Sequence, residues 1–466
     1  MRYLILFISF ITSIILAARL GPYYYGVWGF VLLLLSYFQY FDFGISDSIT
    51  VILVQNKNNI SKTNDFEVNS LLLSSILGIF VVFIAIYYSI WDIPAFEKYN
   101  LGNIFYFVCV IAILAYFNKL FFKVYRVKGK IFEIGFYQSI TTILVIIVVF
   151  LSNEKRLIYF LIFAYILGYL LSSIIFVRGR GISFSGEINV NFCKTIFNKG
   201  FLLFLYNFFF YLILLSTRTI ISFYYTVEEF GFFTFSAVMA NAILIILDAF
   251  AILVIPKVID KFNSNNNAII ETTINSIKTN YVHLSFGMMC LLVFFYPFLL
   301  NFLPKYSSSL KVLNLLSLAV VFSTNSFGYS MYLRAINKEK TLAFISLISL
   351  IINISISLFL AIVLKVNYSY VVFSIMISYF IFTYLCVYYG KKELKQSVNF
   401  FHVLNESLPL RLLIPTLLII LITFLNNKIL TFIPLLVFIL LNIKQITMIY
   451  NTVIKVFENS EIFDIK

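Results

Sequence analysis

Residues 16–54 read LAARLGPYYYGVWGFVLLLLSYFQYFDFGISDSITVILV, an apolar stretch that carries two carboxylates, Asp42 and Asp47, in its second half. Most of it has the composition of a membrane-spanning helix. A charged side chain at the centre of such a helix costs about 2.5 kcal/mol or more on insertion scales. Asp42 and Asp47 therefore require a partner or an aqueous surface.

The rest of the chain has the same apolar character. Of its 466 residues, 62% are hydrophobic and only 12% are charged, whereas a soluble domain carries about 25% charged residues. Apolar runs of about 20 residues recur, which is the length that spans about 30 Å of hydrocarbon as a helix. They lack the period-two alternation of membrane-barrel strands. The sequence predicts an all-α polytopic integral membrane protein.

We predict about fourteen transmembrane helices from these runs. They lie at about 3–19, 27–54, 68–91, 101–120, 132–151, 157–177, 201–222, 230–256, 280–303, 312–333, 341–364, 371–389, 411–425 and 429–443. A Gly- and Ser-bearing connection after the sixth helix predicts a link between two six-helix lobes. The predicted domains are an N-terminal lobe, a cytoplasmic linker, a C-terminal lobe and a C-terminal segment with two helices and a cytoplasmic tail, at 1–177, 178–200, 201–390 and 391–466.

The formal net charge of +14 is explained by topology. With the N-terminus inside, about 25 of the 34 Lys and Arg residues fall on the cytoplasmic side, as the positive-inside rule requires. Both termini are then cytoplasmic. A nucleic-acid surface would concentrate this charge on one soluble domain, and the sequence has no such domain, so we expect no nucleic-acid partner.

An internal repeat supports the two lobes. The heptapeptide YYGVWGF at 24–30 aligns with EFGFFTF at 229–235, which pairs Gly26 with Gly231. A second match, YRVKGK (125–130) with LRAINK, has nearly the same offset. Parallel repeats of this kind are a recurrent plan of transporters, in which the substrate site lies between the repeats.

Polar residues gather on single faces of several predicted helices. The candidate substrate-binding residues are Arg19, Gln39, Asp42, Asn207, Arg218, Asn241, Asp248 and Asn353. Small polar side chains also join helices to each other, so Asn353 has a structural alternative. Arg19 and Arg218 lie near helix ends, where they could extend to the interface. For Asp42 and Asp248 we expect a water-filled cavity or an ion pair, and for Asp47 a solvated position.

Other classes of chemistry lack their motifs. No G-x-x-x-x-G-K-[ST] is present, which excludes ATP hydrolysis of the ABC type. The D-x-D motif is also absent, which counts against a glycosyltransferase. The scattered cysteines and the distant His283 and His402 do not have metal-ligand spacing. We therefore predict no catalytic residues, no metal and no cofactor, with H⁺ or Na⁺ as candidate coupling ions.

Four stretches resemble one known family. ARLGPYYYGVW (18–28) with FDFGISDS (41–48), STRTIISFYYTVEEFG (216–231) and YLRAINKEK (332–340) are similar to the bacterial polysaccharide transporters. These are O-antigen and teichoic-acid flippases, in the superfamily that also holds the multidrug and toxic-compound extruders and the lipid II flippases. The hydropathy plan matches over nearly the whole chain.

The resemblance implies translocation of undecaprenyl-diphosphate-linked oligosaccharide units of O-antigen, capsule or a similar polysaccharide across the bacterial inner membrane by alternating access. It implies that Arg19 and Arg218 hold the diphosphate. The implied partners are this glycolipid, membrane lipids, a polysaccharide polymerase and a chain-length regulator. The alternatives are an H⁺- or Na⁺-coupled multidrug or metabolite extruder of the same superfamily, and a non-transporting membrane protein of glycan assembly.

Overall fold

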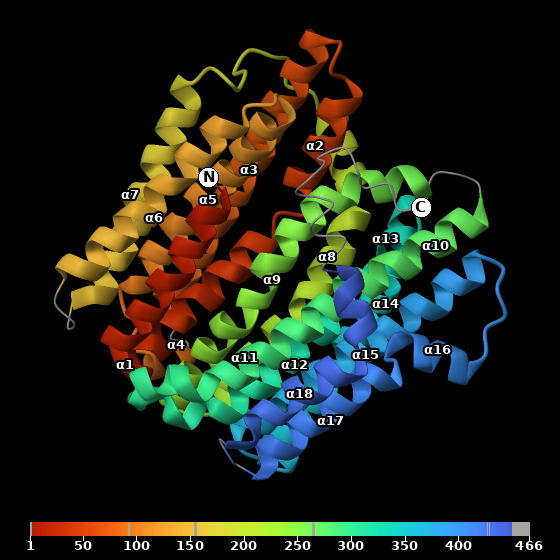
Figure 1. Cartoon of the computed structure of the whole chain (residues 1–466). Helices are drawn as coiled ribbons and strands as arrows, with labels where there is room; N and C mark the ends of the chain where they lie inside the picture. Colours follow the sequence, from red (N-terminus) through yellow and green to blue (C-terminus); the bar gives the residue numbers. More distant parts are fainter. Residues whose placement is uncertain are drawn as a thin grey trace. The chain divides into compact units, whose positions relative to one another are not determined.

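The computed structural model describes residues 2–91, 94–152, 156–262, 266–425, 427 and 429–449. These residues form helices and connecting loops, and none of them lies in a strand (Figure 1). Eleven helices are long and apolar enough to cross a membrane, or up to 13 if each of two bent pairs is one span. The predicted all-α, multi-pass membrane fold is confirmed, with fewer spans among these residues than the fourteen predicted. Residues 450–466 of the predicted tail lie outside the described residues.

The chain divides into two compact units. Unit 1 comprises Met1–Phe208 and Thr226–Gly231, and unit 2 comprises Phe209–Tyr225 and Phe232–Lys466. Helices α8 (Val190–Tyr224) and α9 (Val227–Phe262) contribute to both. Because α8 begins at Val190, the second half of the predicted 178–200 linker is helical. The lobes expected from the sequence stay a prediction.

Unit 1 is built around one central helix. Its helices, besides the first part of α8, are α1 (Arg2–Tyr40), α2 (Ile45–Gln55), α3 (Ile60–Ile90), α4 (Pro94–Lys98), α5 (Ile104–Val127), α6 (Ile131–Leu151) and α7 (Leu157–Arg178). Helix α5 packs against α1, α2, α3 and α7 (Figure 1). Its buried face includes Val108, Ile111 and Ala112, so small and branched side chains let the neighbouring helices approach it. This packing places polar residues of α1, α5, α6 and α7 side by side.

The predicted single span 27–54 is wrong in one respect, because the helix is interrupted. Helix α1 ends at Tyr40 and α2 begins at Ile45. Gly44 has φ 77°, a left-handed conformation that glycine adopts without steric cost. A Cβ on Gly44 would also overlap the backbone oxygen of Gly200. The Asp42 side chain accepts a hydrogen bond from the Gly44 N–H at 3.3 Å, as aspartates do in turns. Asp42 thus lies in the turn between α1 and α2 and stabilises it.

Two glycines that the repeat pairs lie against each other's helices in unit 1. A Cβ on Gly26 of α1 would overlap the backbone oxygen of Val227, and a Cβ on Gly231 of α9 would overlap that of Pro22. The contact is therefore made by backbone on both sides. It joins α1 to the first turn of α9 and requires glycine at both positions.

Unit 2 has α12 and α15 at its core. Its further helices are α10 (Asn267–Ile277), α11 (His283–Phe302), α12 (Leu310–Thr324), α13 (Phe327–Ala335), α14 (Glu339–Leu358), α15 (Tyr368–Glu393), α16 (Phe400–Ser407), α17 (Leu410–Leu425) and α18 (Phe432–Leu441). Helix α15 packs against α12, α13, α14 and α16. Helices α16 and α17 meet at an angle of 62°, so a short helix precedes the span predicted at 411–425.

Candidate substrate site

Asp42 is buried and paired with a lysine. Its Oδ2 lies 2.8 Å from Lys119 Nζ, and the Asp42 side chain is 9% exposed against 33% for Lys119. The Ser46 hydroxyl and the Gly44 N–H also donate to the Asp42 carboxylate. The carboxylate is therefore compensated by one cation and two neutral donors, which is the condition for a buried charge.

Asp47 is paired in the same way, at 2.6 Å from Lys123. Its side chain is 30% exposed, so Asp47 is partly solvated and also has an ion-pair partner, which lies one helical turn beyond Lys119 on α5. The predicted fourth span ends at residue 120, but α5 continues to Val127, so Lys123 is a helix residue as Lys119 is.

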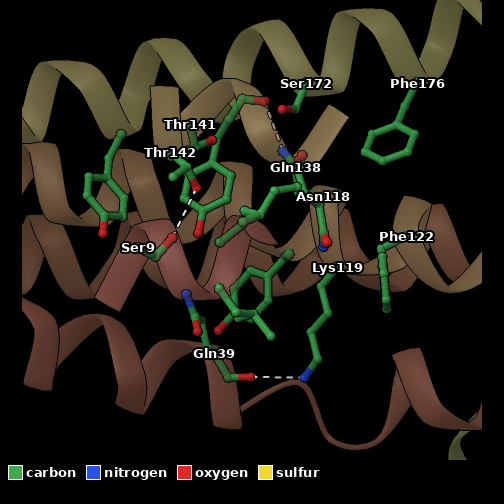
Figure 2. A pocket seen from close by; sticks show the side chains of 16 residues that line it. Ser9, Gln39, Asn118, Lys119, Phe122, Gln138, Thr141, Thr142, Ser172 and Phe176 are labelled. Atoms are coloured by element: carbon green, nitrogen blue, oxygen red, sulfur yellow. Dashed lines mark hydrogen bonds between the residues drawn. The ribbon is translucent and has the colours of Figure 1, made fainter. Parts of the chain in front are cut away.

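Lys119 faces a pocket within unit 1, of about 490 Å³ (Figure 2). Its Nζ also donates to the backbone oxygen of Gln39 at 3.1 Å, and the Gln39 side chain lines the same pocket. The other polar and aromatic lining residues are Ser9, Tyr116, Asn118, Phe122, Gln138, Thr141, Thr142, Tyr165, Tyr169, Ser172 and Phe176. Lys119 is the one charged residue among the lining residues that the structure describes.

The pocket wall is held by hydrogen bonds between helices. Asn118 Nδ2 of α5 donates to the Tyr169 backbone oxygen at 2.9 Å and to the Ser173 hydroxyl at 2.7 Å, both on α7. The Ser172 hydroxyl donates to the backbone oxygen of Tyr137 on α6 at 2.8 Å. Ser9 of α1 and Thr142 of α6 lie within hydrogen-bonding distance across the pocket (Figure 2). Amide and hydroxyl groups therefore stand on fixed helices, next to aromatic rings and one ammonium group.

The structure brings two of the predicted unit 1 residues together. Gln39 lines the pocket, and Asp42 lies behind it as the partner of Lys119. Arg19 does not line the pocket, since its guanidinium donates to the backbone oxygen of Val149 in the last turn of α6. A cation at a helix C-terminus is favourable there. Asn207 is half-buried on α8.

In unit 2, Asn353 of α14 is fully buried. Its Nδ2 lies 2.8 Å from the backbone oxygen of Ile213, 3.0 Å from Ser216 Oγ and 2.9 Å from Thr217 Oγ1, all on α8. Arg218 follows Thr217 and is half-buried. On α9, Asn241 is half-buried and Asp248 is exposed. The part of these residues in substrate binding stays a prediction.

Asn353 provides a test that separates packing from recognition. Replacement by alanine leaves the buried hydroxyls and the Ile213 carbonyl without their shared donor, so we expect a loss of about 1–3 kcal/mol of folding free energy. The thermal midpoint of the purified protein should fall, while transport per folded molecule is kept. Unchanged stability with lost transport would instead assign Asn353 to the substrate.

Sequence reasoning missed several residues of the pocket, above all Lys119 and Gln138. A signal was present: Gln138, Thr141 and Thr142 recur at helical spacing in the apolar run 132–151 and so share one face. Asn118 and Lys119 likewise interrupt an apolar run. These polar residues lie on single helix faces in the same way as the predicted candidates do.

The fold has counterparts among solved membrane-protein structures. It is similar to a multidrug resistance MATE family transporter of the MOP superfamily in an inward-facing conformation, with a TM-score of 0.71, 12% identity and coverage of 83% of this chain and 94% of that one. A second match, the lipid II flippase MurJ in an inward closed conformation, has a TM-score of 0.70, 17% identity and coverage of 97% and 99%.

A MATE structure in the straight conformation matches with a TM-score of 0.60, 12% identity and coverage of 84% and 94%. The fold of this chain is thus similar to that of MATE transporters over 83–84% of its length and to that of the MurJ flippase over 97% of it. No family model and no curated protein matches the sequence.

Proposed function

We propose that the protein is a flippase that moves undecaprenyl-diphosphate-linked oligosaccharide units of a surface polysaccharide across the bacterial inner membrane by alternating access. The observation that carries the proposal is the unit 1 pocket, which offers amides, hydroxyls, aromatic faces and a single cation. In this proposal the protein performs transport without covalent chemistry, and both termini are cytoplasmic.

The chemistry of the substrate matches this lining. A glycan that crosses hydrocarbon unaided loses the water bound to every hydroxyl, at a cost of about 2–7 kcal/mol for each unsatisfied group. Gln39, Gln138 and Thr141 supply replacement partners, and the Lys119 ammonium attracts the acidic part of the substrate. The polyprenyl tail can stay in the lipid. We further propose Arg19 and Arg218 as contacts for the diphosphate, because guanidinium donates two parallel hydrogen bonds to phosphate.

A multidrug extruder coupled to H⁺ or Na⁺ is the second candidate, because its fold is the same. The lining favours the flippase. Gln39, Gln138 and Thr141 offer hydrogen-bond partners for sugar hydroxyls, whereas no carboxylate among the described lining residues could pair with a hydrophobic cation, since Asp42 is already paired with Lys119. An extruder of neutral or acidic metabolites remains an outcome of the following test.

Deletion of the gene distinguishes these functions. If the protein is the flippase, lipid-linked oligosaccharide accumulates on the cytoplasmic leaflet, and surface polysaccharide is lost while drug tolerance is unchanged. Loss of drug tolerance with normal surface polysaccharide would contradict the proposal and support the extruder. Complementation with the wild-type chain is the control.

Gln138→Leu tests the pocket itself. Gln138 is exposed to the pocket on α6, so leucine should fit without loss of stability but removes an amide that the sugar needs. We expect a fall of about tenfold in the rate of glycan flipping, which corresponds to one lost hydrogen bond to a buried polar group. Phe136→Leu, on the same helix outside the pocket, is the control and should flip normally. Equal rates in both variants would remove Gln138 from the site.

A further inference from the structure

A second cavity, of about 410 Å³, lies within unit 2. It is formed where α10 passes into α11 and where the end of α15 meets α16. Its lining includes the titratable residues Lys278, His283, Lys391, His402 and Glu406 and the amide of Asn325. It has no part in the proposed glycan site of unit 1.

The cavity carries an excess of positive charge. Lys278 Nζ lies 3.2 Å from Glu406 Oε1, and Lys391 Nζ lies 2.5 Å from Glu406 Oε2. The side chains of Lys278, Lys391 and Glu406 are only 16%, 14% and 21% exposed. The Tyr329 hydroxyl donates to the same carboxylate. One carboxylate thus faces two ammonium groups, and it neutralises only one of them. The remaining charge is poorly solvated, so an anion would stabilise it.

Asn325 gives an independent indication of a ligand. Its side chain is 2% exposed and lines the cavity. Nδ2 donates weakly to the backbone oxygen of Ser407 at 3.4 Å. Oδ1 is buried and has no hydrogen-bond partner among the residues that the structure describes. A buried acceptor without a donor costs about 1–3 kcal/mol, so this atom favours a ligand that carries a hydroxyl or amine as well as an anion.

We propose that this cavity binds the headgroup of an anionic phospholipid. The phosphodiester accepts from Lys278 and Lys391 beside the Glu406 carboxylate that bridges them, because each ammonium group has further N–H donors. A hydroxyl of the headgroup donates to Asn325 Oδ1. A membrane lipid is favoured over free phosphate because the adjoining α16 exposes two phenylalanines. Phe400 and Phe401 are 59% and 74% exposed, beside the polar His402, which is the pattern of a helix in the membrane interface.

The test uses the full-length protein in nanodiscs of phosphatidylcholine with increasing phosphatidylglycerol, with the thermal midpoint as the readout. Phosphatidylglycerol should raise the midpoint. Lys391→Met should increase the half-saturating lipid fraction about tenfold, because one charged hydrogen bond is lost. Glu406→Gln should decrease it, because the cavity becomes more positive. Lys338→Met is the matched control: it removes the 2.9 Å ion pair with Glu393 at the other side of α15 and should leave the lipid response unchanged.

Opposite responses of the two cavity variants would support the anion site, since a merely structural role would weaken both. Phosphatidylmethanol, which has the phosphodiester but no hydroxyl, should stabilise less than phosphatidylglycerol. Equal stabilisation by phosphatidylcholine and phosphatidylglycerol, or equal shifts in both variants, would overturn the proposal. Stabilisation by inorganic phosphate in phosphatidylcholine nanodiscs, with no response to phosphatidylglycerol, would overturn the lipid as the ligand.

Discussion

Lys119→Met is expected to reduce both stability and glycan flipping. Methionine keeps the length of the side chain but removes the cation, so the Asp42 carboxylate, 9% exposed, is left without its ionic partner. Breaking a buried pair in this way costs about 3–5 kcal/mol, and the one-third exposure of Lys119 brings the expected loss to about 2–4 kcal/mol. The thermal midpoint in detergent measures this effect. The pocket also loses its cation, so flipping should fall to the level of the deletion strain.

Two further variants separate these effects. Lys123→Met removes the pair with Asp47, whose side chain is 30% exposed, and we expect a loss of at most about 1 kcal/mol with normal flipping. The double variant Lys119→Met with Asp42→Asn should recover most of the stability, because no charge is left unpaired. Flipping should stay low in it. If the double variant flips normally, Lys119 serves only to neutralise Asp42, and the pocket does not need its charge.

The fold class followed from the sequence because hydrophobic length is a local property. Runs of about 20 apolar residues specify membrane helices whatever their neighbours are. The interruption at Phe41–Gly44 was not predicted, since the apolar run continues on both sides of it and a single Asp or Gly does not by itself end a membrane helix. Its cause is the close approach of Gly44 to the Gly200 backbone and the turn that Asp42 closes. Both depend on a segment far away in the chain.

The site was predicted less completely, because its contacts also join segments that are far apart in the chain. The sequence raised the need for a partner of Asp42 but not its identity, because Lys119 lies on another helix, far from Asp42 along the chain. Gln39 was selected from its helical face and does line the pocket. The Arg19 guanidinium donates to a backbone oxygen at the C-terminal end of α6. The sequence around Arg19 could not indicate this contact, because α6 is far away in the chain.

The internal repeat leads to the second large effect. Gly26→Ala and Gly231→Ala should each prevent the contact between α1 and α9, because the added Cβ would overlap a backbone oxygen, of Val227 and of Pro22 respectively. Backbone atoms cannot change rotamer to make room, so the helices have to separate. We expect a loss of about 3 kcal/mol for each variant, measured as the thermal midpoint and as the yield of monodisperse protein after extraction from the membrane.

Gly78→Ala distinguishes this local clash from a general effect of alanine at glycine positions. Gly78 is also a helix residue, and its added Cβ would meet only the Ile113 side chain, at ordinary distances of 3.4 Å to Cγ2 and 3.9 Å to Cγ1. Alanine is the better helix former by about 0.5–1 kcal/mol, so Gly78→Ala should keep or raise the midpoint. Because the two backbones approach each other at Gly26 and Gly231 alike, a variant at either position should abolish the same contact, and the double variant should cost little more than one. Additive losses would mean that the two glycines act at separate contacts and would contradict this prediction.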